Sequence, residues 1–420
     1  MRDKIVPRKL ESLILKFLER KEIVGIRGPR QAGKTTLLKS IMNKIEGDKV
    51  LIDMYFSDLK EEFERRPLDF VKRFKKDGKL YLFLDEIQKC ENAGESLKVI
   101  YDNFPDIKIF ISGSSSLEIK TNILPHLVGR IFLYELLTFD FYEFILYKDD
   151  SLAKILQEKQ NSFRNFLEGK DELEEPSFIS EFNRYLNEYL IFGGYPEVVK
   201  ASTQEEKIQI LRNIYITWLE KDIVNFFNIL ETSSFENLVR YLSSKVGNII
   251  SISSISSDLK ISYKKVLKYI EVLKNSYIIG ILKPFYKNLV TEIKKAFKIY
   301  FLDLGLRNSV LNNFLNFENR SDSEKGFLLE NFIYRELIAN YNDYKINYWR
   351  TTGKAEIDFI LSKNERIVPI EVKLSGNISR GFYSFLESYN PENAIVITLD
   401  KFERRKYKNT EIFFVPAFYV

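Results

Sequence analysis

Residues 23–35 read IVGIRGPRQAGKT, and this stretch decides the fold at the start of the chain. The short apolar run Ile23–Ile26 is typical of a buried strand, and the segment Gly28–Thr35 after it fits the pattern G-x-x-x-x-G-K-[ST]. Glycines let the backbone wrap around an anion without Cβ clashes, and the N–H groups that begin the following helix point at that anion. The stretch therefore predicts a strand, a phosphate-binding loop and a helix over Thr35–Ile45. The residues predicted to line the loop are Gly28, Pro29, Arg30, Gln31, Ala32, Gly33, Lys34, Thr35 and Thr36.

An acidic pair follows a second apolar run. Leu80–Leu84 is predicted to be a buried strand that delivers Asp85 and Glu86 to the edge where the loop lies. With a nucleoside triphosphate in the loop, Lys34 would neutralise β- and γ-phosphate charge, while Thr35 and Asp85 would hold Mg²⁺. Glu86 would then orient the attacking water as a base. Such a pair is also an ordinary helix cap, but together with the loop upstream it predicts triphosphate binding and hydrolysis.

Two further features bear on this site. A third apolar run, Ile107–Ile111, leads into serines, of which Ser112 and Ser114 are candidates for touching the γ-phosphate or the attacking water. A simple serine-rich turn is the alternative. Arg130 is a candidate arginine finger, and a finger supplied by a neighbouring subunit implies a homo-oligomer. For this arginine a surface salt bridge is the alternative.

The composition excludes several classes of protein. The 420 residues are 45% hydrophobic and include 34 Phe and 24 Tyr, which excludes a mainly disordered chain. Cys90 and His126 are the single cysteine and histidine, which excludes a disulfide scaffold and a conventional Cys/His zinc site within one chain. No nucleophile elbow accompanies His126. No run of about 18 apolar residues and no signal-peptide core appears, so we expect a cytoplasmic protein without a membrane partner.

The motifs at Gly28–Thr35, Leu80–Gln88, Ser112–Ser115 and Gly129–Arg130 together resemble the AAA+ branch of P-loop ATPases. More narrowly, the chain resembles the prokaryotic and archaeal AAA+ ATPases that carry a C-terminal DUF4143 region. The resemblance implies ATP as the nucleotide, an AAA+ core, a helical lid, a winged helix and a nuclease-like end. The supporting phrases are Phe192–Glu197, Leu219–Ile223 and Phe301–Arg307.

Changes of pattern divide the chain. Apolar runs between helices are typical of a doubly wound parallel sheet up to about residue 136, and the pattern then becomes helical. Further on, a short helix at Ile255–Leu259, a helix capped by Ser262, and strand-like runs at Ile278–Phe285 and Phe297–Leu302 follow the order of a winged helix-turn-helix. We therefore predict an AAA+ P-loop ATPase core at 1–136, a helical lid or linker region at 137–240, a winged helix-turn-helix at 241–312 and a C-terminal α/β restriction-endonuclease-like domain at 313–420.

The last part carries an acidic constellation. Asp358 and the triplet Glu371-Val372-Lys373 lie on neighbouring predicted strands, and Glu330 lies on the helix before them. Carboxylates in this arrangement suit a second Mg²⁺ or Mn²⁺, with Lys373 placing a water or stabilising charge. The set resembles the PD-(D/E)xK nuclease core, although Ile357 stands where that pattern has proline. Alternating charges on a half-exposed strand are the alternative, and such cores are often reused without activity.

Residues 258–298 carry ten lysines and three acidic residues, a net charge of +7 in a chain of +5. Lys264, Lys265 and Lys268 lie near the start of the predicted recognition helix, where groove-binding modules make their contacts. This pattern predicts DNA binding, and a solvated lysine face is the alternative. The residues predicted to add contacts are Tyr263, Tyr286 and Asn288, together with the wing lysines Lys287, Lys294 and Lys295.

The leading hypothesis is an AAA+ ATPase that hydrolyses ATP with Mg²⁺ and couples hydrolysis to DNA engagement through the winged helix. One alternative is an ATP-regulated, metal-dependent DNA nuclease with Glu330, Asp358, Glu371 and Lys373 as its site. Another is a signalling ATPase whose C-terminal half binds protein partners only.

Overall fold

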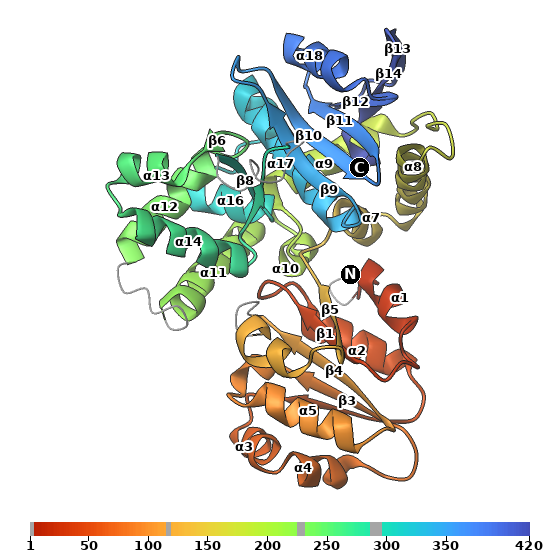
Figure 1. Ribbon diagram of the computed structural model, residues 1–420, viewed down its shortest axis with the longest axis vertical. Coiled ribbons are helices and arrows are strands. Elements are labelled where there is room, and N and C mark those ends of the chain that lie inside the picture. Colours follow the sequence, from red (N-terminus) through yellow and green to blue (C-terminus); the bar gives the residue numbers. More distant parts are fainter. Residues whose placement is uncertain (1–3, 115–118, 225–231, 286–295) are drawn as a thin grey trace. The chain divides into compact units, whose positions relative to one another are not determined.

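The computed structural model describes residues 4–114, 119–224, 232–285 and 296–420 (Figure 1). Within these ranges the chain forms two units. One holds Ile5–Thr138 together with Asn275–Tyr277, and the other holds Phe139–Lys274 and Ile278–Val420. Each unit is described by itself.

The N-terminal unit is built on a parallel sheet of order β2-β3-β4-β1-β5. Its strands are β1 (Ile23–Arg27), β2 (Asp48–Asp53), β3 (Leu80–Asp85), β4 (Ile107–Gly113) and β5 (Ile131–Glu135). Because all five run in one direction, the ends of β1, β3 and β4 meet at one edge of the sheet. This confirms the predicted α/β fold with a parallel sheet. The unpredicted strand is β5, an edge strand with half-buried side chains.

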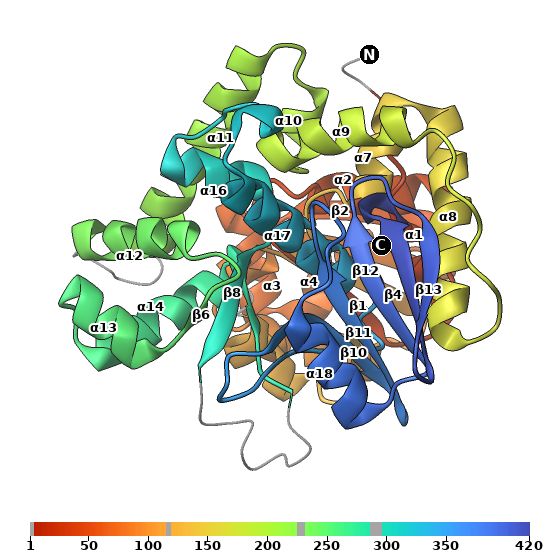
Figure 2. The same ribbon diagram turned by 90° about the horizontal axis from the view of Figure 1, so that it is seen from above.

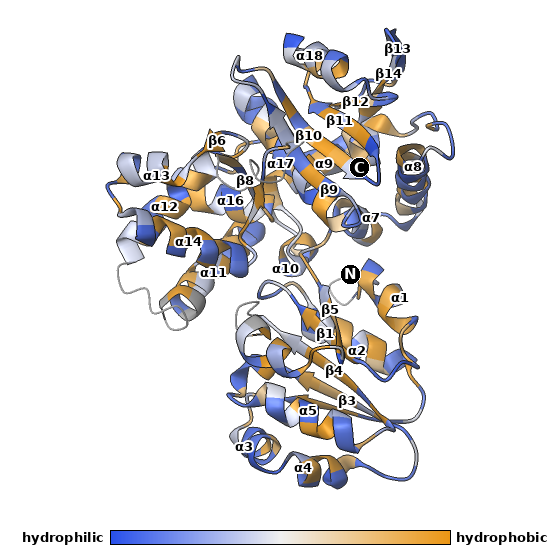
Figure 3. Ribbon diagram, in the orientation of Figure 1, coloured by the Kyte–Doolittle hydropathy of each residue, from blue (hydrophilic) through white to orange (hydrophobic). Residues whose placement is uncertain are grey.

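Helices cover both faces of this sheet. They are α1 (Lys9–Leu15), α2 (Lys34–Lys44), α3 (Ser57–Arg65), α4 (Pro67–Phe74) and α5 (Ala93–Asn103). Successive residues of a strand face opposite sides, so Leu82 and Leu84 of β3 enter one core and Phe83 enters the other. Phe83 stacks on Phe110 of β4 with ring centroids 4.5 Å apart, beneath α2. The hydropathy colours in Figure 3 show these apolar strands beside the apolar residues of α2.

The second unit begins with helices, as the pattern after residue 136 predicts. They are α7 (Phe141–Lys148), α8 (Asp150–Glu168), α9 (Ile179–Phe192), α10 (Pro196–Lys200) and α11 (Gln204–Trp218). Asp140 caps α7 in a reciprocal capping box with Glu143, and Asp149 caps α8. The short 3-10 and π-helical turns of the chain are Ile87–Lys89, Ile119–Ile123, Leu124–His126, Leu219–Val224, Phe317–Asn319 and Ala417–Tyr419.

Three helices and a small antiparallel sheet follow, and Figure 2 shows them grouped together. The helices are α12 (Thr232–Ser244), α13 (Ile252–Leu259) and α14 (Tyr263–Asn275). The strands are β6 (Ile249–Ile250), β7 (Ile279–Leu282) and β8 (Phe297–Phe301), in the order β6-β8-β7. The order of helix, turn, helix and hairpin is the predicted one. The predicted wing residues Tyr286, Lys287, Asn288, Lys294 and Lys295 lie outside the described residues.

The chain ends in a six-stranded mixed sheet of order β13-β14-β12-β11-β10-β9. Its strands are β9 (Lys345–Arg350), β10 (Glu356–Lys363), β11 (Arg366–Val372), β12 (Asn393–Thr398), β13 (Glu403–Tyr407) and β14 (Thr410–Pro416). The accompanying helices are α16 (Leu304–Leu311), α17 (Asp322–Asn340) and α18 (Arg380–Tyr389). The sequence predicted α17, which carries Glu330, and the neighbouring strands β10 and β11, which carry Asp358 and Glu371.

Two of the phrases that support the family resemblance meet at one structural junction. Asp303 caps α16 by accepting from the N–H of Leu306 at 3.0 Å and also accepts from the N–H of Gly194 at 2.9 Å. A Cβ on Gly305 would lie 2.0 Å from the carbonyl oxygen of Phe192. The glycines and the aspartate are therefore needed for close backbone packing between the end of α9 and the start of α16.

Replacing Asp303 by alanine is expected to cost about 2 kcal/mol, because it leaves two buried N–H donors without their acceptor. Both tryptophans, Trp218 and Trp349, belong to this unit, so tryptophan fluorescence in urea reports its unfolding alone. The exposed Asp400→Ala serves as the control and should change stability by less than about 0.5 kcal/mol. Equal effects of the two substitutions would contradict this role for Asp303.

Candidate nucleotide-binding site

The loop between β1 and α2 has the conformation that its glycines allow. Gly33 takes φ 94° immediately before α2, in the left-handed region that favours glycine. A Cβ on Gly28 would lie 2.0 Å from the carbonyl oxygen of Leu136. The ammonium of Lys34 donates to the carbonyls of Gly28 at 3.0 Å and Pro29 at 2.7 Å, so it lies inside the loop.

A residue that the sequence reasoning missed supports the loop from behind. The guanidinium of Arg8 donates to the carbonyl of Ala32 at 2.8 Å and to the carbonyl of Leu137 at 2.7 Å. Arg8 is buried, and a charge in such a place is tolerated when its donors are used. It lies far upstream of the loop in sequence, so no local motif could have indicated it.

Asp85 meets the loop where β3 ends. The hydroxyl of Thr35 donates to Asp85 Oδ2 at 2.6 Å. The Ser112 hydroxyl donates to Asp85 Oδ1, which also accepts from the N–H of Glu86 at 3.1 Å. The structure thus brings together the two residues predicted to hold a metal ion. Ser112, a candidate for touching the γ-phosphate or the attacking water, is fully buried and orients Asp85 instead.

Glu86 is tied to the third strand through a glutamine. Its backbone takes φ 54°, an unusual value for a residue with a side chain, and strain of this kind gathers at functional sites. Its carboxylate accepts from the amide nitrogen of Gln88, and the same nitrogen donates to the Ser114 hydroxyl at 3.0 Å. A Cβ on Gly113 would lie 2.5 Å from Gln88 Oε1, so the glycine makes room for this bridge. Sequence reasoning gave Gln88 no role of its own.

Arg130 lies at the opposite end of the strands from the loop. It directly precedes β5, and Ile23 at the start of β1 pairs with Ile131, whereas the loop follows the end of β1. Its guanidinium makes two hydrogen bonds to the carboxylate of Asp102, at 3.0 and 3.3 Å. Arg130 therefore takes no part in the site of its own chain.

The structure brings together the acidic residues predicted in the C-terminal part, and their carboxylates are largely buried. Glu371 accepts from the ammonium of Lys373 at 2.9 Å and from Ser379 at 3.1 Å, and Asp358 accepts from the N–H of Val372 at 2.9 Å. Burial, and then the charge of Asp358, raises the pKa of Glu371 to about 7. Burial also raises the pKa of Glu330 to about 7, against the effect of a neighbouring lysine. Within the described ranges, no group of three His, Cys, Asp or Glu side chains is arranged to hold a metal ion.

That neighbouring lysine corrects the interpretation of the basic segment. Lys298 was counted among the lysines predicted to face DNA, but its side chain is 1% exposed and contacts Glu330, Glu356 and Asp358. The predicted positions on α14 are different. Lys264, Lys265 and Lys268 are exposed, while Val266 and Ile270 face the core.

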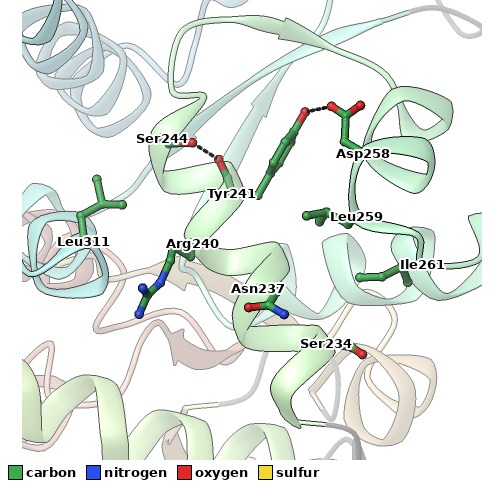
Figure 4. A pocket seen from close by; sticks show the side chains of 9 residues that line it. All are labelled: Ser234, Asn237, Arg240, Tyr241, Ser244, Asp258, Leu259, Ile261 and Leu311. Carbon is green, nitrogen blue, oxygen red and sulfur yellow. Dashed lines mark hydrogen bonds between the residues drawn. The ribbon is translucent and has the colours of Figure 1, made fainter.

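A cavity of about 410 Å³ lies among α12, α13 and α16 (Figure 4). The Tyr241 hydroxyl donates to Asp258 at 2.6 Å across it, which joins α12 to α13. Arg240 is the one cation among its lining residues. The hydrogen bond between Tyr241 and Asp258 gives this cavity a structural explanation as a contact between helices.

In the part of the chain that the structure describes, no helix has the length and apolarity that crossing a membrane requires.

The parallel sheet, the glycine loop after β1 and the acidic pair after β3 define a P-loop nucleotide-binding fold of the AAA type. Comparison with known families agrees with this class. Residues 20–145 match the AAA domain family, residues 325–418 match a domain of unknown function (DUF4143), and residues 183–316 match a second one (DUF8612). The chain thus combines an N-terminal AAA domain with a C-terminal DUF4143 region, as the resemblance predicted.

Two curated relatives are similar in sequence to this chain along most of its length. The uncharacterized protein MJ1544 of Methanocaldococcus jannaschii is 27% identical over 393 residues, which are 89% of this chain and 78% of the relative. The uncharacterized protein Rv2008c of Mycobacterium tuberculosis is 22% identical over 386 residues, 90% of this chain and 77% of the relative.

Two solved structures are weakly similar to this chain. The Walker-type ATPase PABY2304 of Pyrococcus abyssi is 16% identical, with a TM-score of 0.47, over 74% of this chain and 97% of that one. The ORC2 protein of Aeropyrum pernix is 13% identical, with a TM-score of 0.34, over 72% of this chain and 91% of that one.

Proposed function

We propose that this protein is an ATPase that binds ATP with Mg²⁺ in the loop Gly28–Thr35 and hydrolyses it. The observation that carries the proposal is the 2.6 Å contact between the Thr35 hydroxyl and the Asp85 carboxylate. A hydroxyl from the start of α2 and a carboxylate from the end of β3 are hard oxygen ligands, and they meet beside a loop whose glycine leaves no room for a Cβ.

The loop supplies the groups that bind the phosphates. The backbone N–H groups of the loop residues other than Pro29, with the start of α2, would make an anion-binding concavity. The Lys34 ammonium, held by the carbonyls of Gly28 and Pro29, would exchange these acceptors for β- and γ-phosphate oxygens. Ser114 would add a contact near the γ-phosphate. Adenine preference rests on the resemblance to the AAA+ group.

Hydrogen bonds from neighbouring side chains orient the proposed metal ligand Asp85 and the proposed base Glu86. When bound, Mg²⁺ would neutralise negative charge that develops during hydrolysis. Thr35 and Asp85 would hold it, and Ser112 fixes the orientation of Asp85. Glu86 would accept the proton of the attacking water, and Gln88 holds its carboxylate beside Ser114.

We further propose that hydrolysis is coupled to DNA, through α12 to α14 and the β7–β8 hairpin acting as a winged helix. The support is the exposed face of α14, which presents Lys264 and Lys268 together with the half-exposed Tyr263 and Leu267. The coupling is tested by phosphate release from ATP with and without duplex DNA. Stimulation by DNA that is lost in Lys34→Ala supports coupling, and an unchanged rate contradicts it.

The double substitution Lys264→Ala and Lys268→Ala is expected to weaken DNA binding and make it less dependent on salt. Each phosphate contact contributes about 0.9 to the slope of log affinity against log salt, so the slope should fall by about 2. Fluorescence anisotropy with a labelled duplex at several salt concentrations measures it. The exposed pair Lys98→Ala and Lys154→Ala is the charge-matched control, and an equal loss in both proteins would assign binding to net charge alone.

Arg130 fits a role toward a second copy of the chain better than a role in its own site. We propose that it completes a neighbour's nucleotide site in a homo-oligomer. Since exposed salt bridges contribute little, release of Arg130 from Asp102 costs little. Turnover per molecule that rises with protein concentration, and that is lost in Arg130→Ala, tests this role.

Two alternatives predict other results. A nuclease using Glu330, Asp358, Glu371 and Lys373 would nick plasmid DNA with Mg²⁺ or Mn²⁺, and the activity would disappear in Asp358→Asn. A signalling ATPase with protein partners only would hydrolyse ATP but shift no duplex at any salt concentration.

A further inference from the structure

Lys298 is a buried lysine at the centre of a sheet. It lies on β8, the middle strand of the small sheet, where it pairs with Ile249 of β6 and Leu282 of β7. Its side chain is 1% exposed. Burying an ammonium is costly unless the charge is paired and its donors are used, so its surroundings must supply several acceptors.

Three carboxylates surround this ammonium. Lys298 Nζ lies 2.7 Å from Glu356 Oε1, 3.0 Å from Glu330 Oε1 and 3.6 Å from Asp358 Oδ1. Glu330 comes from α17, and Glu356 and Asp358 share one face of β10 because they are two residues apart. Tyr300, on the same face of β8 as Lys298, donates its hydroxyl to Glu330 Oε1 at 2.5 Å. One lysine thus joins β8 to both the helix and the six-stranded sheet.

The sequence predicted a divalent metal ion at this acidic constellation, and the structure places an ammonium among its carboxylates instead. The oxygens of Glu330 and Asp358 that would hold a metal ion face a positive charge that is already bound. A second ammonium, that of Lys373, lies 2.9 Å from Glu371 Oε1. Among the described residues, Glu371 Oε2 is a buried oxygen without a hydrogen-bond partner, but a divalent ion there would lie close to the Lys373 ammonium, which pairs with the same carboxylate.

We propose that the Lys298 ammonium takes the place of a divalent metal ion in the cluster of Glu330, Glu356 and Asp358. An internal cation then stabilises the C-terminal fold and joins the small sheet to the six-stranded sheet. On this proposal the carboxylate cluster has a structural role and does not cleave DNA. Because Lys298 lies in the middle of a hydrogen-bonded strand, the cation is a permanent part of the fold.

The test is divalent binding by the full-length, nucleotide-free protein, followed as loss of the free Mn²⁺ signal in electron paramagnetic resonance. Lys298→Met removes the charge and keeps an apolar stem, so the freed carboxylates should bind Mn²⁺ at least tenfold more tightly than the wild type does. The gain should disappear in the double variant Lys298→Met with Asp358→Asn. Lys298→Arg, which keeps the charge, should show no gain.

The control is Lys363→Met, which removes a half-exposed lysine paired with Asp343 and Glu168 in the same unit. It should leave Mn²⁺ binding at the wild-type level. A folded Lys298→Met that binds no better than the wild type overturns the proposal. A saturable Mn²⁺ site in the wild type that Asp358→Asn abolishes also overturns it, and this comparison decides the matter even where Lys298→Met does not fold.

Discussion

Replacing Glu86 by glutamine is expected to lower ATP turnover by about 10²- to 10⁴-fold, the range in which a positioned general base contributes. Glutamine keeps the size of the side chain and its oxygen acceptor toward Gln88, but it cannot take a proton from water. Asp85, Thr35 and Lys34 are untouched, so the affinity for ATP with Mg²⁺ should stay within about threefold of the wild type. A loss of turnover without a loss of binding is the signature of a group that acts in the chemical step.

Steady-state phosphate release measures turnover, and equilibrium binding of a fluorescent ATP analogue measures affinity. Lys34→Ala is the contrasting variant, because it removes the charge that faces the phosphates and should lose both. Glu95→Gln, an exposed carboxylate at the start of α5, is the matched control and should change neither. Turnover of Glu86→Gln close to that of the wild type would remove Glu86 as the base.

Two parts of the site could be predicted because each is a short motif of consecutive residues. The loop and the pair Asp85-Glu86 each follow an apolar run, and the carboxyl ends of parallel strands share an edge, so their meeting could be inferred. The bridge from Glu86 through Gln88 to Ser114 could not, because it depends on the rotamer of a glutamine over Gly113. For the same reason Ser112 was a candidate for touching the γ-phosphate or the attacking water, whereas in the structure its hydroxyl donates to Asp85.

Charge patterns misled the sequence reasoning where burial reverses their usual meaning. Lys298 stands in a lysine-rich segment, and a lysine in such a place is ordinarily solvated. Only the approach of Glu330 and the β10 carboxylates, far along the chain, makes it an internal cation. The strand β13 was missed because Glu403–Tyr407 is an exposed edge strand rich in charge, which has no apolar alternation to detect.

A second buried ion pair gives the largest expected effect on stability. Glu336 of α17 is fully buried, and its carboxylate accepts from the guanidinium of Arg335 at 2.8 Å, from Asn340 at 3.2 Å and from the N–H of Phe141 at 3.3 Å. Phe141 begins α7, so the carboxylate also stabilises the positive end of that helix dipole. Arg335 is itself 1% exposed. This pair therefore connects α17 to the first helix of the unit.

Replacing Glu336 by glutamine is expected to lower the free energy of unfolding of this unit by about 3–5 kcal/mol, because it removes one partner of a buried ion pair. Urea unfolding followed by the fluorescence of Trp218 and Trp349 measures the change. Glu387→Gln breaks the exposed pair with Lys408 and should change the stability far less, because an exposed pair contributes little. Replacing both Arg335 and Glu336 by apolar residues should cost less than Glu336→Gln alone, because both charges of the pair are then removed from the interior. If Glu336→Gln proves as mild as Glu387→Gln, the neighbouring carboxylates of Asp140 and Glu143 compensate the charge of Arg335, and the contact with Glu336 is not what connects α7 to α17.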